Sequence, residues 1–144
     1  AGSAISTVIG PVAPGGSGPG VSAGGEALPL EGEVDSGTPG AVLGYPGNGP
    51  FTISPARAGP TAIAISEDSY GRGPIRRSLT SLRGAVRSGN SGGPLVNGDG
   101  EVVTTVFAAT TEGKPGGYGI PNDIVAAAVN ESAGAGAVST GPCA

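Results

Sequence analysis

The sequence predicts an all-β domain that follows a loose N-terminal arm. Short segments rich in Val, Ile and Thr recur after residue 40, and clusters of Gly, Asn, Asp and Pro separate them. This is the pattern of short β-strands joined by tight turns. The 30 Gly and 14 Pro among 144 residues would otherwise suit a low-complexity chain. Because the apolar residues are grouped rather than scattered, we favour one folded domain.

The first 39 residues form the predicted arm. They are mostly small residues interrupted by Gly and Pro, as in PVAPGGSGPGVSAGGEA. Such a segment buries too little apolar surface to offset the entropy that it would lose on ordering. We therefore expect residues 1–39 to be a linker or a peripheral strand, and residues 40–144 to form the domain.

Four strands are expected in the middle of the chain. AVLGY, residues 41–45, is the first, and the turn cluster PGNGP follows it. The next two strands are predicted over residues 51–57 and 61–66, before the polar loop EDSYGRG. A longer strand is predicted over residues 75–83. Each of these segments is apolar or alternating and is bounded by turn residues.

A hairpin and one helix complete the predicted elements. Residues 94–107 contain PLV, the turn NGDG and the strand EVVTTVF. Asn-Gly and Asp-Gly both tolerate the positive φ that hairpin turns require. PNDIVAAAV, residues 121–129, is the single expected helix. In it, Asn122 would accept hydrogen bonds from first-turn amides and Asp123 would complement the helix dipole.

The composition argues against several classes of function. Seven Lys and Arg against eleven Asp and Glu give a net charge of −4, and the arginines are spread over residues 57–87. Nucleic acid is therefore not an expected partner. No apolar run approaches the ~20 residues of a membrane-spanning helix, and no signal-peptide pattern opens the chain. We expect no membrane contact by this segment. No carboxylate has metal-ligand spacing with His or Cys, so no metal or cofactor is expected.

Bulky core residues are scarce. Two Phe, three Tyr and no Trp or Met leave little volume for a hydrophobic core. Small domains bury a smaller fraction of their surface than large ones. We therefore expect this domain to need a partner lobe.

The hexapeptide GNSGGP, residues 89–94, carries the chemistry. A serine hydroxyl becomes a nucleophile when a base takes its proton and hydrogen-bond donors stabilise the oxyanion that forms on attack. The amides of Gly89 and Ser91 can supply those donors, while Gly92 and Gly93 keep side chains away from a substrate. The chain has no histidine to act as the base. A glycine-rich surface turn is the competing interpretation of these residues.

The motif and its context resemble a known family. GNSGGPLV, the strand EVVTTVFAA and then GYGIPNDIV resemble the C-terminal barrel of chymotrypsin-like serine proteases, particularly the HtrA type. AVLGYPGNGPFTISPARAG and IRRSLTSLRGAVRSGNSGGPLV are similar to the MarP-type periplasmic proteases of actinobacteria. The resemblance covers about residues 38–144. It implies a Greek-key antiparallel β-barrel, the second of two, with a short C-terminal helix.

The resemblance implies a serine endopeptidase that is periplasmic or extracellular and, in full length, membrane-anchored. Ser91 would be the nucleophile, and Gly89, Asn90 and Ser91 would form the oxyanion hole. The His and Asp of the triad would lie on an N-terminal barrel, so this chain alone would be inactive on its peptide or protein substrate. A catalytically inactive peptide-binding or scaffold module is the alternative. A Ser-Lys dyad through Lys114, the only lysine, is disfavoured because its loop would flank the specificity pocket.

Asn90 differs from the digestive members of the family. They carry an Asp there, which pairs with a newly cut N-terminus during activation. Because an amide cannot form that ion pair, activation here is not expected to depend on a buried ammonium group. By residue type alone, Asn90 is a turn residue.

Cys143 is the only cysteine and lies next to the C-terminus. From the sequence alone it is either a free thiol or one half of a bridge to something outside the segment. The ending STGPC resembles that of the MarP-type proteases, and this resemblance implies a disulfide with a cysteine of the N-terminal barrel.

The resemblance also places a pocket around the substrate side chain that precedes the cut. It would be formed by Ala85–Ser88, Phe107, Ala108, Ala109 and Gly116–Tyr118. None of these is acidic, and Glu112 is the nearest acidic candidate. Binding Arg or Lys requires a buried carboxylate to offset desolvation of the cation. We therefore expect apolar or small polar side chains there, with Phe107 narrowing the pocket and Tyr118 adding a hydroxyl.

Overall fold

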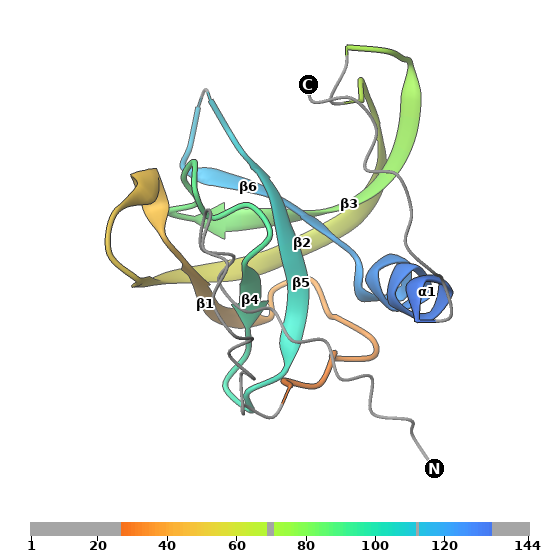
Figure 1. The fold of residues 1–144 in the computed structure, drawn as a ribbon. Coiled ribbons are helices and arrows are strands. Elements are labelled where there is room, and N and C mark those ends of the chain that lie inside the picture. The colour runs from red at the N-terminus through yellow and green to blue at the C-terminus, as the bar shows by residue number, and fades with distance from the viewer. Residues whose placement is uncertain (1–26, 69–70, 112, 134–144) are drawn as a thin grey trace, which may run out of the picture.

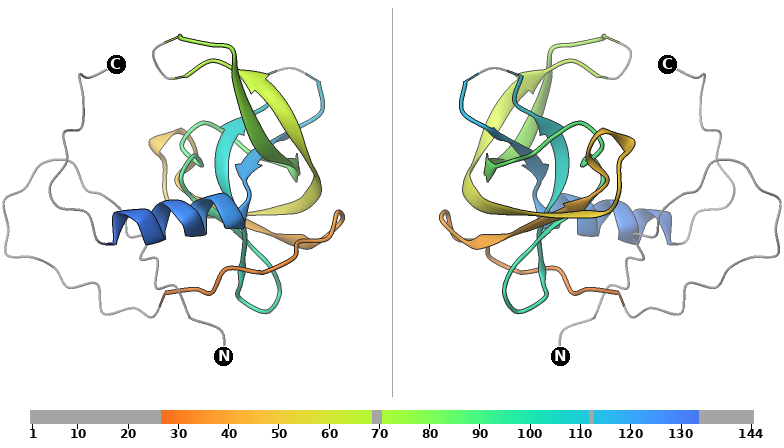
Figure 2. Two further views of the ribbon diagram at one scale, coloured as in Figure 1. Left: turned by 90° about the vertical axis from the view of Figure 1, so that its right-hand side faces the viewer. Right: turned by 90° about the vertical axis from the view of Figure 1, so that its left-hand side faces the viewer.

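The structure is a computed structural model that describes residues 27–68, 71–111 and 113–133. Its elements are the strands β1 (Pro39–Gly44), β2 (Thr52–Ser66), β3 (Ile75–Gly84), β4 (Pro94–Val96), β5 (Val102–Ala109) and β6 (Gly116–Ile120), the helix α1 (Asn122–Ser132) and the 3-10 turn η1 (Pro46–Asn48). Figure 1 shows the strands wrapped around a common axis, and Figure 2 shows α1 projecting from one side of them.

The strands close into a barrel in the order β1-β2-β3-β6-β5-β4. Every pair of neighbouring strands is antiparallel. Pairing of Ala41 with Val96 and of Val42 with Leu95 joins the first strand to the fourth and completes the ring. Closure removes most of the open sheet edges that would otherwise invite association. The predicted all-β, Greek-key barrel with a C-terminal helix is confirmed.

The predicted break between residues 57 and 61 is wrong. The segment forms one strand, β2, whose register against β3 shifts between Ala58 and Thr61. Pro60 lies inside this irregularity, where the ladder does not require its missing amide hydrogen. Beyond the bulge, Thr61 Oγ1 lies 2.7 Å from Thr80 Oγ1. β2 and β3 then continue as a curved two-stranded ribbon beyond the other strands (Figure 1).

The barrel interior is filled by small aliphatic side chains. They are Val42, Ala58, Leu82, Val86, Leu95, Val103 and Val106. The aromatic residues that the structure describes in full lie outside this cluster, since Tyr45, Phe51, Phe107 and Tyr118 are all exposed. The scarcity of bulky residues therefore does not prevent a closed core, and the aromatic surface remains available for contacts.

The end of the predicted arm is attached to the barrel. Leu30 forms a parallel bridge with Val102. The Glu31 amide donates to the Val102 carbonyl over 2.9 Å, and the Val102 amide donates to the Pro29 carbonyl over 2.8 Å. Peripheral strand is therefore the better of the two expectations for this part of the arm. Residues 1–26 lie outside the described residues.

The expected helix is present, but the predicted role of Asn122 is wrong. Pro121 is the N-cap residue, and no side chain caps the helix start. Asn122 is buried, and its Nδ2 donates to the carbonyls of Glu31 and Val102 over 2.9 and 2.7 Å. It therefore ties the arm to β5. No helix among the described residues is long and apolar enough to cross a membrane.

Shortening a side chain in the barrel core is expected to lower the free energy of unfolding far more than shortening one on the β2–β3 ribbon. Leu95 is fully buried, whereas Ile65 on the β2–β3 ribbon is 73% exposed. Leu95→Ala should lower the free energy of unfolding by ~2–5 kcal/mol because it leaves a cavity. Ile65→Ala should stay within ~0.5 kcal/mol of the parent. Urea denaturation measures both, and equal losses would contradict this placement of the core.

Candidate active site

Ser91 lies at the surface in the turn between β3 and β4. Its side chain is exposed, and its Oγ donates a hydrogen bond to the carbonyl of Phe107 over 3.2 Å. Phe107 is in the last part of β5, so the hydroxyl of the motif lies at the end of that strand. The predicted nucleophile is therefore accessible to a peptide that runs along β5.

The turn around Ser91 is held by backbone hydrogen bonds. The Asn90 amide donates to the Arg87 carbonyl, and the Gly93 amide donates to the Asn90 carbonyl, both over 3.0 Å. The turn is also joined to β5. The Gly92 amide donates to the Val106 carbonyl, and the Val106 amide donates to the Gly93 carbonyl, both over 2.8 Å. Ser91 is thus carried by a turn that is fixed at both ends.

The same hydrogen bonds orient the two amides predicted to form the oxyanion hole. The carbonyl of Ser88 accepts from the Gly47 amide over 2.7 Å. In a trans peptide the C=O and the next N–H point in opposite directions. The Gly89 N–H therefore points away from η1. The Asn90 carbonyl accepts from the Gly93 amide, and this bond fixes the direction of the Ser91 N–H in the same way. Among the described residues, neither of these two amides donates a hydrogen bond.

The glycines of the motif are needed for different reasons. Gly89 has φ +91°, and a side chain there would collide with the carbonyl of Tyr45. Gly92 has φ +82° with nothing close to an added Cβ. An added Cβ at Gly93 would meet the carbonyl of Leu43 on β1. Gly89 and Gly92 thus supply the backbone conformation, while Gly93 allows close packing of the turn on β1.

One side of β5 is unpaired at its C-terminal end. β4 pairs with β5 only as far as Thr105. The Thr110 amide donates to the Gly116 carbonyl over 3.0 Å, toward β6. Because backbone groups alternate in direction along a strand, those of Ala109 point to the other, open side. Ser91 lies on this side, since it reaches the Phe107 carbonyl. Residues 107–109 therefore offer a strand edge to an extended peptide.

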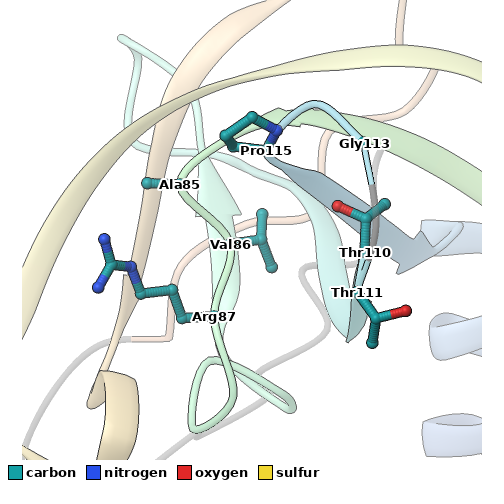
Figure 3. Close-up of a pocket in the computed structure, with 7 residues that line it drawn as sticks. All are labelled: Ala85, Val86, Arg87, Thr110, Thr111, Gly113 and Pro115. Carbon is teal, nitrogen blue, oxygen red and sulfur yellow. The ribbon is translucent and has the colours of Figure 1, made fainter.

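A pocket of about 270 Å³ lies beside the turn. Among the described residues it is lined by Ala85, Val86, Arg87, Thr110, Thr111, Gly113 and Pro115. Figure 3 shows Val86 pointing toward Thr110, whereas the guanidinium of Arg87 points away from it. None of the seven lining residues is acidic. The pocket thus presents small and apolar side chains together with threonine hydroxyls.

Of the residues predicted to surround the substrate side chain, three are among the described residues that line this cavity. Ala85, Val86 and Arg87 line the pocket, whereas Phe107 and Tyr118 are exposed outside its lining. Ala108, Ala109 and Gly116 do not line it either. An added Cβ at Gly117 would lie 2.9 Å from Val86 Cγ1, which shows how closely β6 packs behind the turn.

The described residues contain no base in contact with Ser91. In the described part of the chain its Oγ donates to the carbonyl of Phe107, and Lys114 is exposed and forms no hydrogen bond with it. A cation does lie near this end of β5, since the guanidinium carbon of Arg77 is 5.5 Å from the ring centre of Phe107. No group of His, Cys, Asp or Glu in the described part of the chain can hold a metal ion.

Comparisons with known proteins agree with this geometry. No protein-family model matches the chain. The serine proteases MT3772 and Rv3671c of two Mycobacterium tuberculosis strains are each 36% identical over 103 residues, which is 71% of this chain. The active form of the Rv3671c protease superposes with a TM-score of 0.77 at 32% identity over 85% of this chain. The barrel is homologous to that of chymotrypsin-like serine proteases.

More distant structures share the fold of this chymotrypsin-like barrel. The HtrA-type protease AlgW bound to a decapeptide is 19% identical, with a TM-score of 0.62 over 78% of this chain. The serine endoprotease of Yersinia pestis is 17% identical, with a TM-score of 0.58. The chain spans 26% of the length of the curated relatives and 55% of the active Rv3671c structure.

Sequence reasoning missed one contact of the chymotrypsin-like barrel. The loop between β1 and β2 touches the nucleophile turn through the Gly47 amide and the Ser88 carbonyl. The cluster PGNGP signalled a turn in this loop but not its neighbour. Two residues named in the predictions lie outside what the structure describes, namely the acidic candidate Glu112 and Cys143 with its predicted disulfide.

Substitution of Gly89 is expected to disturb the turn. Gly89→Ala places a side chain at φ +91° and against the Tyr45 carbonyl. It should lower the free energy of unfolding by more than ~1 kcal/mol. Gly98→Ala is the control, because nothing lies within 4 Å of its added Cβ, and it should change stability by less than ~0.5 kcal/mol. Thermal or urea unfolding compares the two variants, and equal stability would contradict the strained turn.

Proposed function

We propose that this chain is the nucleophile-bearing barrel of a serine endopeptidase. The observation that carries the proposal is the grouping of an exposed Ser91 hydroxyl, an open strand edge and two amides that have no acceptor among the described residues. A nucleophile, an oxyanion hole and a means of holding an extended peptide are the parts that acyl transfer requires. Homology to serine proteases supports the same conclusion.

In the proposed reaction, Ser91 Oγ attacks the scissile carbonyl while a histidine outside this chain takes its proton. The negative charge on the carbonyl oxygen is stabilised by the N–H groups of Gly89 and Ser91. Each such donor is worth on the order of 10²–10³ in kcat. The histidine then protonates the leaving amine, and water releases the acyl group by the same steps in reverse order. An aspartate keeps the histidine in the required tautomer.

Substrate binding would use the open edge of β5. Residues 107–109 can form antiparallel backbone hydrogen bonds with the part of the peptide on the acyl side of the cut. Such bonds hold the peptide through its main chain. The Phe107 carbonyl at present accepts from Ser91 Oγ. A substrate amide can take over this carbonyl, and the hydroxyl is then free to turn toward its base.

The histidine and aspartate are proposed to lie on an N-terminal barrel of the same protease. The exposed apolar surface supports a covering domain: Tyr45 and Phe51 form an edge-to-face pair with ring centres 5.6 Å apart, and Ile53 is 63% exposed. Exposed apolar groups that gather in this way are typical of interaction surfaces. The solved Rv3671c structure is also longer than this chain.

The periplasmic or extracellular setting and the membrane anchor of the full-length protein rest on the resemblance to MarP-type proteases. The disulfide of Cys143 belongs to the same proposal, because such bonds persist in oxidising compartments.

A catalytically inactive peptide-binding module is the second candidate, and the lack of histidine in the chain favours it. It would use the same strand edge without turnover. The coding sequence before Ala1 separates the two functions. A histidine-bearing strand followed by an aspartate there supports the protease.

The isolated chain is expected to be inert. No imidazole is present to accept the Ser91 proton, so these 144 residues should neither hydrolyse peptides nor react appreciably with a fluorophosphonate probe. In the complete protease, Ser91→Ala should abolish turnover apart from the residual acceleration due to binding and the oxyanion hole. Full activity of the isolated chain at neutral pH would overturn the two-barrel proposal.

The complete protease is expected to prefer apolar or small polar side chains before the cut. None of the described residues that line the pocket carries a carboxylate that could offset the desolvation of a cation. Discrimination among apolar side chains should be modest, because one methylene contributes only ~1–3 kcal/mol. Cleavage of a mixed peptide library measures this preference. Dominant cleavage after Arg or Lys would show that another carboxylate, such as Glu112, enters the pocket.

A further inference from the structure

Asn90 is the buried polar residue at the centre of the nucleophile turn. It is 1% exposed, although Ser91 and Gly89 on either side of it are exposed. Buried polar side chains in proteins are usually hydrogen-bonded. Its contacts therefore show what holds the turn in shape.

The side chain and the backbone of Asn90 both bind Arg87. Asn90 Oδ1 accepts from the Arg87 amide over 2.9 Å, and the Asn90 amide donates to the Arg87 carbonyl over 3.0 Å. These two bonds close a ring around residues 87–90. Because Ser88 and Gly89 lie inside this ring, it fixes the peptide group whose N–H is the first oxyanion donor.

The other end of the side chain lies against β1. Asn90 Nδ2 is buried and has no acceptor among the described residues. It faces Gly44, where an added Cβ would lie 2.6 Å away. The titratable side chains nearest along the surrounding segments are Arg87 in the turn and Tyr45 after β1. Both residues are exposed, and among the described residues neither of these two side chains forms a hydrogen bond or an ion pair with Asn90.

We infer that Asn90 is a positioning residue whose neutral amide keeps the oxyanion turn formed without a charged partner. The inference rests on the proposed protease function. A carboxylate of the same shape can still accept from the Arg87 amide. Its second oxygen, however, would be buried beside Gly44 without a cation. Burial disfavours the charged form and raises the pKa of such a carboxyl group, so an aspartate here makes the turn sensitive to pH.

The test uses Asn90→Asp in the complete protease. At neutral pH the ionised carboxylate should disturb the turn and lower kcat about 10²-fold, the effect of losing one oxyanion donor, with KM nearly unchanged because the β5 edge is intact. As pH falls through the raised pKa of the new carboxyl group, the group becomes neutral and the loss should recover. The ratio of variant to parent kcat is measured at each pH, because titration of the catalytic histidine cancels in it.

Asn130→Asp is the matched control, since Asn130 is exposed on α1, and its ratio should stay near one at every pH. Each kcat is divided by the folded fraction from circular dichroism, so that a purely structural loss does not count. A ratio near one for Asn90→Asp at every pH overturns the inference. A parent protein without Ser91-dependent turnover instead contradicts the proposed function.

A second measurement covers the case in which the variant does not fold. In the parent protein, amide hydrogen exchange of Arg87 should be slow, because its N–H donates to the buried Asn90 Oδ1. The neighbouring Gly89 amide, which has no acceptor among the described residues, should exchange much faster. Equal exchange of the two amides would show that the Asn90 bond does not form, and would overturn the inference.

Discussion

The hydrogen bond from the Gly47 amide to the Ser88 carbonyl determines how the candidate site is oriented. It fixes the plane of the peptide group that carries the Gly89 N–H, and this group must point toward the substrate if it is to bind an oxyanion. The bond forms only if the η1 loop approaches the turn closely. That approach depends on the missing side chain at Gly89, where any Cβ would meet the Tyr45 carbonyl.

The rest of the site is positioned by the barrel core. Val106 is buried in the core, and its backbone exchanges hydrogen bonds with Gly92 and Gly93, the two residues that follow Ser91. Val86 belongs to the same core and also lines the pocket. On the other flank, Leu95 follows the motif directly and pairs with Val42 to close the barrel. The turn is therefore a short connection between well-packed residues. This is how a core of small side chains can hold the amides of the turn in place.

The sequence predicted those elements whose pattern is local. β1, β3 and the β4–β5 hairpin alternate or run apolar between turn residues, and they lie where expected. β6 was not predicted as a strand, because three of its five residues are Gly and leave no periodicity. The break in β2 was predicted because Gly59-Pro60 is a turn signal, yet pairing with β3 holds the strand together. Asn122 is of a residue type that often caps helices, but its side chain forms hydrogen bonds with the arm and β5 instead. The motif was enough to predict Ser91 as the nucleophile. The direction of the Gly89 N–H, however, depends on Gly47, which lies about forty positions away in the sequence.

The exposure of the turn explains how one barrel can keep half of an active site without being destabilised by it. Gly89 and Ser91 are exposed, so water can satisfy their unpaired amides in this chain, and the orphaned donors cost little. A covering barrel would remove that water. The hydrogen bonds to a developing oxyanion would then form in a medium of lower dielectric, where they are stronger. On the proposed function, the N-terminal barrel therefore contributes in two ways, by supplying the histidine that accepts the Ser91 proton and by drying the site around amides that this chain has already oriented.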